Sequence, residues 1–312
     1  SGLKKEHIGY ENGVHGFVTS AVQVLSEPGD KILIHSPFYL GFREDIEGLR
    51  RVSVCSPLKK DSEGIWRMDY EDMDRKLKEH HIHLAIFCSP HNPTGRVWER
   101  WELEKAMEVY EANDCYVISD EIWADLTFEG HCHIPTQMTN EWAKEHVVAA
   151  YAPSKTFNLA GLIGSFHIIY SNYLRDRINS YGHATHYNEM NVLSMHALIG
   201  AYQPEGYEWL EELRSVLEGD ARYAVSFIRD HFDGVDVADP QGTYMIFLDC
   251  TKYCENSGKS IDELLKEGWK VGVGWQDGRA FGGPCHIRMN LASPRARIEE
   301  AFERLGKYVF EG

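Results

Sequence analysis

The sequence predicts an α/β fold: a mostly parallel sheet with helices on both faces, followed by a smaller α+β domain. Over residues 1–170, short apolar runs rich in β-branched side chains alternate with longer amphipathic segments. Near-continuous apolar strands separated by helices are typical of a parallel sheet that is buried on both faces. From about residue 188 onward, long helical segments replace this alternation. These two observations define the predicted architecture.

The elements of the first part follow from the alternation. Segments with helical periodicity lie between several of the strand-like runs, and such crossover helices are the connections that parallel strands require. The predicted strands are residues 31–35, 51–55, 83–88, 115–119, 147–151 and 166–170. The predicted helices are residues 41–49, 70–80 and 99–113.

The second part has longer helices and fewer strands. Its predicted elements are helices at residues 188–201, 207–232 and 295–310 and strands at residues 242–249 and 270–275. The second of these helices is long enough to leave one domain and enter another. We place the boundary near Gln203-Pro204-Glu205-Gly206 and predict a large domain at residues 1–204 and a small domain at residues 205–312.

Composition excludes several classes of protein. The 312 residues carry 32 Lys and Arg against 48 Asp and Glu, a net charge of −16, which disfavours binding to a nucleic-acid backbone. No apolar run approaches the ~18–20 residues of a membrane span. The seven cysteines are scattered and form no CxxC pair. We therefore expect a cytoplasmic protein with reduced cysteines and neither disulfides nor a zinc site.

Four short motifs lie at the ends of predicted strands, where the loops of an open parallel sheet converge on a ligand. Each motif is weak alone, but together and in this order they are specific. They are Ser89-Pro90-His91-Asn92-Pro93-Thr94-Gly95, Ser119-Asp120-Glu121-Ile122-Trp123, Ser154-Lys155-Thr156-Phe157-Asn158-Leu159-Ala160-Gly161 and Arg288-Met289-Asn290-Leu291-Ala292.

With these motifs, the chain resembles pyridoxal-phosphate (PLP) enzymes of the aspartate-aminotransferase fold. Within the class I/II aminotransferase-like family it is most similar to the branch of cystathionine β-lyases and other C–S lyases. The similarity to the lyase branch is strongest in the sequence segments at residues 90–98 and 152–158. The resemblance runs from Gly13 to the C-terminal helix. It implies a seven-stranded type of sheet, PLP as cofactor, an amino acid as substrate and a homodimer.

The resemblance also implies roles for the motif residues. Lys155 would form a Schiff base with the cofactor and, once displaced by substrate, remove the Cα proton. Asp120 would pair with the pyridine nitrogen and keep it protonated. Asn92 would bond the phenolic oxygen of the cofactor, Tyr39 would stack on its ring, and the guanidinium fork of Arg288 would bind the substrate α-carboxylate.

The phosphate of the cofactor is expected at a helix N-terminus, where free N–H groups and the helix dipole favour an anion. The candidates are the backbone of Val14 and His15, helped by the Ser154 hydroxyl. Two side-chain contacts common in the family are absent, because Ala152 and Ile163 occupy their positions.

Trp123 also departs from the family pattern, since a Tyr or His often stands three residues after the Asp. An indole can only donate a hydrogen bond. Its role stays open.

Three functions remain open on these motifs. A C–S β-lyase and an aminotransferase need the same base, electron sink and carboxylate clamp, and we favour the lyase on the local phrases. The third is an inactive or ligand-sensing form. Ser1 is not an initiator Met, and the resembled enzymes carry several tens of residues before it, so we expect the N-terminal part of the large domain to be missing.

Two other patterns carry no prediction of a site. His80-His81-Ile82-His83 and His131-Cys132-His133 are followed by no further ligands at metal-site spacing. The glycines between Gly272 and Gly278 have the wrong spacing for a dinucleotide loop. We predict neither a metal nor a dinucleotide.

Overall fold

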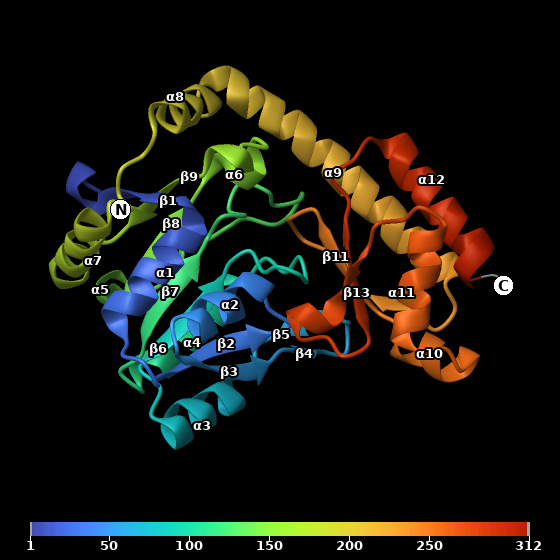
Figure 1. Cartoon of the computed structure of the whole chain (residues 1–312), viewed down its shortest axis with the longest axis horizontal. Helices are drawn as coiled ribbons and strands as arrows, with labels where there is room; N and C mark the ends of the chain where they lie inside the picture. The colour runs from blue at the N-terminus through green and yellow to red at the C-terminus, as the bar shows by residue number, and fades with distance from the viewer. Residues whose placement is uncertain (1, 311–312) are drawn as a thin grey trace.

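The computed structural model describes residues 2–310 and contains two main sheets, a large one and a small one (Figure 1). The large sheet has seven strands in the order β1-β9-β8-β7-β6-β2-β3. Its strands are β1 (Ile8–Asn12), β2 (Lys31–Ser36), β3 (Val52–Pro57), β6 (Leu84–Cys88), β7 (Tyr116–Asp120), β8 (Val147–Tyr151) and β9 (Gly164–Ile168). A short hairpin, β4 (Lys59–Lys60) and β5 (Trp66–Arg67), stands apart.

The large sheet is parallel from β3 to β8 and antiparallel at its other edge. Strands β3, β2, β6, β7 and β8 pair in parallel, whereas β9 runs antiparallel to β8 and β1 antiparallel to β9. The mostly parallel sheet confirms the predicted α/β fold. The sequence did not predict β1, whose five residues include Gly9 and Glu11 and lack a run of β-branched side chains.

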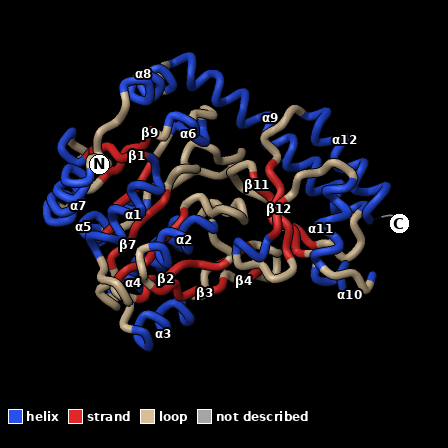
Figure 2. The backbone as a smooth tube through the Cα atoms, viewed as in Figure 1, coloured by secondary structure: helices blue, strands red, loops and turns tan. Residues whose placement is uncertain are grey.

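Helices cover both faces of this sheet, and Figure 2 shows the strands enclosed between them. Along β6, Ile86 packs into one core while its neighbours Ala85 and Phe87 pack into a second core on the opposite face. This alternation follows from the period of two in a strand, and it requires apolar helices on both sides. The helices are α1 (Gly13–Leu25), α2 (Leu40–Gly48), α3 (Tyr70–His80), α4 (Arg100–Glu111), α5 (Glu141–His146), α6 (Pro153–Thr156), α7 (Asn172–Thr185) and α8 (Val192–Ala201).

The rest of the chain builds a four-stranded antiparallel sheet in the order β10-β11-β13-β12, packed against helices. The long helix α9 (Pro204–His231) extends from α8 to α12 in Figure 1. It begins at Pro204, within the predicted boundary segment, although the division into domains at residues 204 and 205 stays a prediction. The other elements are β10 (Asp236–Val237), β11 (Met245–Asp249), α10 (Thr251–Ser257), α11 (Ile261–Lys270), β12 (Gln276–Asp277), β13 (His286–Asn290) and α12 (Arg295–Leu305).

The predicted strand at residues 270–275 is wrong. Helix α11 continues to Lys270, and the only strand nearby within the described residues is the two-residue β12. Trp275 folds back onto the helix: its indole N–H donates to the Leu265 carbonyl (3.1 Å), and a Cβ on Gly268 would lie 2.2 Å from its ring. Gly272 permits this reversal, since its φ is +83°. The aromatic residue therefore serves helix packing, not a strand.

Phe302 tests the core between α12 and α9. Its side chain is fully buried and stacks on Phe232, with ring centroids 6.0 Å apart. Replacing it with Ala should lower the free energy of unfolding by about 3–5 kcal/mol, because the cavity cannot collapse fully. Tyr308→Ala, at a side chain that is 60% exposed, is the control and should cost less than about 0.5 kcal/mol. Urea denaturation followed by circular dichroism measures both, and equal effects would contradict this packing.

Candidate active site

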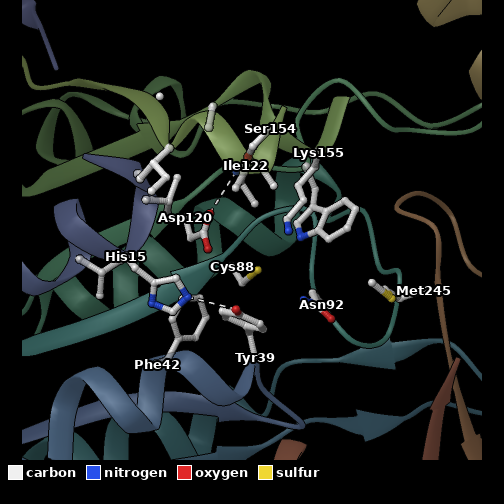
Figure 3. Close-up of a pocket in the computed structure, with 18 of the residues that line it drawn as sticks. His15, Tyr39, Phe42, Cys88, Asn92, Asp120, Ile122, Ser154, Lys155 and Met245 are labelled. Atoms are coloured by element: carbon white, nitrogen blue, oxygen red, sulfur yellow. Dashed lines mark hydrogen bonds between the residues drawn. The ribbon is translucent and has the colours of Figure 1, made fainter. Parts of the chain in front are cut away.

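A cavity of about 300 Å³ lies at the carboxyl ends of the parallel strands β6, β7 and β8 (Figure 3). Its volume is at the lower end of the range typical of small-ligand sites. All eight residues predicted for the site line it: Val14, His15, Tyr39, Asn92, Asp120, Ser154, Lys155 and Arg288. Residues up to 274 positions apart in sequence thus share one space, although the role of each stays a prediction.

Lys155 lies in the short helix α6, directly after β8, and Pro153 begins that helix. Its amine is 5.9 Å from the centroid of the Trp123 ring. Burial lowers the pKa of Lys155, the positive charge of Arg288 acts in the same direction, and Asp120 opposes both. A lysine whose pKa is lowered has a larger neutral fraction, so it can act as a nucleophile or a base.

Asp120 ends the central strand β7, and its side chain is only 5% exposed. Its Oδ1 accepts a hydrogen bond from the Ile122 amide (3.1 Å). Within the described residues, no cationic side chain lies within ion-pair distance of it, and burial raises its pKa to about 6. A cationic partner placed in the cavity would therefore stabilise the ionised form of this buried carboxylate.

Arg288 reaches the cavity from β13 of the small sheet. Its Nη1 donates to Oδ1 of Asn92 (3.1 Å), and its Nε donates to Oε1 of Gln276 (2.9 Å). The guanidinium also lies over the Phe281 ring, with Cζ 4.1 Å from the centroid. Burial lowers the pKa of Arg288 to about 10, so the group stays cationic at neutral pH. These contacts fix a planar fork that can bind a carboxylate.

Gln276 was not identified from the sequence. It pairs with Arg288 across the β12–β13 ladder, where the sequence analysis expected the preceding segment to be the strand. Asn92 accepts from Arg288 through its oxygen, which leaves its amide N–H groups as donors for a ligand.

The N-terminus of α1 faces the same cavity and is open to an anion. Asn12, its N-cap residue, makes no side-chain cap hydrogen bond, and the first N–H groups of a helix have no partner within the helix. Gly13 has a φ of +77°, and a Cβ there would lie 3.0 Å from Cγ2 of Ile163. Val14 and His15, whose backbone is the predicted phosphate site, therefore line the cavity at this helix end.

The side chain of His15 is a second feature that the sequence did not identify, since only its backbone was a candidate. Its Nδ1 lies 2.9 Å from Oδ2 of Asp45, and its Nε2 lies 3.0 Å from the Tyr39 hydroxyl. The three residues come from α1, α2 and the loop before α2. No local sequence signal joins them.

The departures from the family pattern all form walls of the cavity. Trp123 is 2% exposed and packs edge-on against Tyr244, with centroids 4.6 Å apart. Ala152 and Ile163 contribute apolar surface. Ile163 has a φ of +55°, which is strained for a β-branched residue. At the positions of Ala152 and Ile163 the cavity wall therefore offers no side-chain hydrogen-bond donor.

Other parts of the chain show no competing chemistry among residues 2–310. No group of three or more His, Cys, Asp or Glu side chains is arranged there to hold a metal ion. His133 instead contacts Glu121, with Nε2 2.7 Å from Oε2. None of the described helices is both long enough and apolar enough to cross a membrane.

Comparison with known proteins identifies the family. The family model for aminotransferase class I and II matches residues 2–305. The chain belongs to the aminotransferase class I and II family. The cystathionine beta-lyase PatB of Bacillus subtilis (strain 168) is a family relative, 31% identical over 306 residues, which are 97% of this chain and 78% of PatB.

Two further relatives show the range of activities. Cystalysin from Treponema denticola, whose crystal structure contains pyridoxal 5'-phosphate, superposes with a TM-score of 0.92 at 28% identity, covering 99% of this chain and 78% of that one. A probable aspartate/prephenate aminotransferase of Aquifex aeolicus (strain VF5) is 28% identical over 287 residues, 91% of this chain and 71% of the relative.

PLP is the cofactor of this family, and the residues on the cavity fit it. An aldehyde needs an amine, which Lys155 supplies with a lowered pKa. A protonated pyridine nitrogen needs a carboxylate partner, and the buried Asp120 makes no ion pair among the described residues. A phosphate needs N–H donors, which the uncapped α1 N-terminus offers.

Asp120 should destabilise the cofactor-free protein at neutral pH. Folding raises the pKa of Asp120 from 3.8 to about 6. The protonated carboxyl therefore contributes to the stability of the fold at low pH, and this contribution is lost as the pH rises through about 6. Asp120→Asn should therefore raise the free energy of unfolding by up to about 3 kcal/mol at pH 7.5, with the gain shrinking toward pH 4. Urea denaturation at both pH values measures this, and a less stable Asn variant at pH 7.5 would contradict it.

Proposed function

We propose that the protein is a PLP-dependent C–S β-lyase that cleaves a sulfur amino acid to a thiol, pyruvate and ammonia. The observation that carries this proposal is the convergence of Lys155, Asp120 and Arg288 on one cavity, in a chain 31% identical to a cystathionine beta-lyase. Cystalysin and other PLP-bound C–S lyases share the fold at 28% identity.

In this proposal each residue holds one part of the reacting assembly. Lys155 holds the cofactor, Asp120 keeps its ring nitrogen protonated, and the α1 N-terminus with Ser154 binds its phosphate. Asn92 donates to its phenolic oxygen and Tyr39 stacks on its ring. When bound, PLP supplies an electron sink for the substrate Cα.

Arg288 binds the α-carboxylate of the amino acid and so fixes which Cα bond faces Lys155. Once the substrate amine has replaced Lys155 on the cofactor, the freed Lys155 amine takes the Cα proton as general base, which its lowered pKa favours. The electron pair of that C–H bond forms a Cα–Cβ double bond, and the Cβ–S pair leaves on sulfur as a thiolate. The released enamine hydrolyses to pyruvate and ammonia.

Aminotransfer is the second candidate function. It is favoured by the 28% identity to the Aquifex aeolicus aminotransferase and by the fact that it needs the same three residues. The two reactions differ only in whether the carbanion expels a group at Cβ or is reprotonated.

The resemblance also supports a homodimer in the cytoplasm. Helix α8 is apolar on most of its surface, and Val192, Leu193 and Ile199 are 65%, 71% and 51% exposed. An apolar face of this kind is typical of a protein interface. All seven cysteines are free, which suits a reducing compartment.

The lyase proposal is tested with L-cystathionine. The PLP-loaded protein should release thiol and pyruvate in equal amounts, measured with a thiol reagent and a coupled lactate dehydrogenase assay. Lys155→Ala should reduce turnover to background and remove the visible absorbance of the bound cofactor, because the only amine on the cavity wall among the described residues is lost. Amino transfer to a keto acid without pyruvate would replace the lyase with the second candidate.

Arg288→Ala should mainly weaken substrate binding. Losing charge-assisted hydrogen bonds to a carboxylate costs about 1.5–3 kcal/mol, which corresponds to a rise in KM of about 10- to 150-fold. Arg279→Ala is the matched control, since Arg279 is an exposed arginine held by Asp262 and Asp277. An unchanged KM in Arg288→Ala would argue against the carboxylate clamp.

A further inference from the structure

Three side chains form a continuous hydrogen-bonded chain at the edge of the cavity, from Asp45 through His15 to Tyr39 (Figure 3 shows the His15–Tyr39 contact). The Asp45 carboxylate is mostly buried, whereas the His15 side chain is 51% exposed. The chain thus runs from an anion, through an imidazole open to water, to a phenol on the cavity wall.

The surrounding structure is shaped for this arrangement. A Cβ on Gly41 would lie 2.1 Å from Cε1 of His15 and 2.7 Å from Cε1 of Tyr39, so only glycine leaves room for both rings. Phe42 packs edge-on against Tyr39, with centroids 5.6 Å apart, and fixes the position of the phenol. Gly41 and Phe42 therefore fix the contact by packing, Gly41 beside both rings and Phe42 beside Tyr39.

The protonation state of His15 decides what Tyr39 presents to the cavity. In the imidazolium, both ring nitrogens donate: Nδ1 to Asp45 and Nε2 to the phenol oxygen. The phenol hydrogen is then free to point into the cavity. In the neutral imidazole with Nδ1–H on Asp45, Nε2 accepts the phenol hydrogen, and Tyr39 offers the cavity only lone pairs.

We propose that His15, held by Asp45, is a positioning residue that directs the hydroxyl proton of Tyr39 into the cavity, where Tyr39 acts as the general acid for the departing sulfur. This inference rests on the proposed β-lyase function. It assigns the His15 side chain a role in addition to that of its backbone.

The proton balance is complete with water as the source. As the Cβ–S bond breaks, its electron pair leaves on sulfur; the Tyr39 O–H bond breaks and an S–H bond forms. The phenolate takes the Nε2 proton of His15, and the half-exposed imidazole takes a proton from solvent.

Charges on several elements act on this chain. Asp45 and Glu44 face His15 from α2, Asp120 faces it from β7, and Arg288 faces Tyr39 from β13. The hydrogen bond to Asp45 is the largest influence and raises the pKa of His15, while burial opposes it. Because its pKa is raised, His15 stays protonated up to a higher pH, and the phenol hydrogen of Tyr39 points into the cavity over the same pH range.

The first test follows the titration of His15 by NMR in the PLP-loaded full chain, with His15→Gln identifying the signal. Asp45→Asn should lower the pKa of His15 by about one pH unit or more, because it removes the anionic acceptor. Glu44→Gln is the matched control, an exposed carboxylate on the same helix without a hydrogen bond to His15, and should shift it far less. Equal shifts in the two variants would overturn the proposal.

The second test is the pH profile of kcat/KM for pyruvate formation. The wild type should lose activity as the pH rises through the pKa of His15. His15→Gln should retain activity but lose this limb, since an amide N–H donates to Tyr39 at every pH, and His15→Ala should fall about 10- to 100-fold. In a Tyr39→Phe background, His15→Ala should cost nothing further.

The outcomes separate the two proposals. An unchanged limb in His15→Gln, or full additivity with Tyr39→Phe, overturns the role of His15 while elimination persists. Absence of pyruvate at every pH, with the Asp45-dependent titration of His15 intact, overturns the lyase function and leaves the hydrogen-bonded chain supported.

Discussion

The buried carboxylate of Asp120 is the constraint on which the site depends. It stands at the end of the central strand of the large sheet, between Cys88 and Ala150 on the neighbouring strands, and its hydrogen-bond donor is a backbone amide. Burying an anion there costs free energy, and the fold bears that cost because rigid strands hold the group in place on both sides. A protonated pyridine ring in the cavity beside this carboxylate would consequently be stabilised more than it is in water.

The second determinant is that the cavity wall comes from two sheets. Asp120 ends a strand of the large sheet and Lys155 lies in α6, directly after β8. Arg288 belongs to the small sheet, where Gln276 holds it, and Asn92 joins the two sides through its contact with Arg288. A further tie lies nearby, because the Gln241 amide donates to the Gly95 carbonyl (2.8 Å) just after Asn92. In the proposed function, Arg288 on the small sheet would bind the amino acid and Lys155 beside the large sheet would attach the cofactor, and the loop with Asn92 and Gly95 contacts residues on both sides.

Much of the fold could be predicted from sequence because its signals are local. Helix α3 matches its prediction at both ends: the Asp69 side chain caps the first turn by accepting from the Asp72 amide, and His81 ends the helix with a φ of +51°. The placement of Asn92, Asp120 and Lys155 was predictable because their motifs follow parallel strands whose ends must meet. Arg288 lies within β13 of the antiparallel sheet, so only the family resemblance pointed to it. The segment at residues 270–275 was not predictable, because Trp275 packs its ring on Gly268 and donates to the Leu265 carbonyl instead of pairing in a strand. Likewise, Asp45 and His15 are 30 residues apart, and only the packing of α1 on α2 brings them together.

The absence of a Cβ at Gly41 limits which substitutions this pocket can accept. The sizes of residues 15, 39 and 41 are linked, because the imidazole and the phenol occupy the space that a side chain at position 41 would fill. Introducing the histidine alone into a homologous protein with a larger residue at the position of Gly41 would place the imidazole against that side chain. Replacing Gly41 in this chain with a larger residue would require the rings of His15 and Tyr39 to move, so the three positions are coupled.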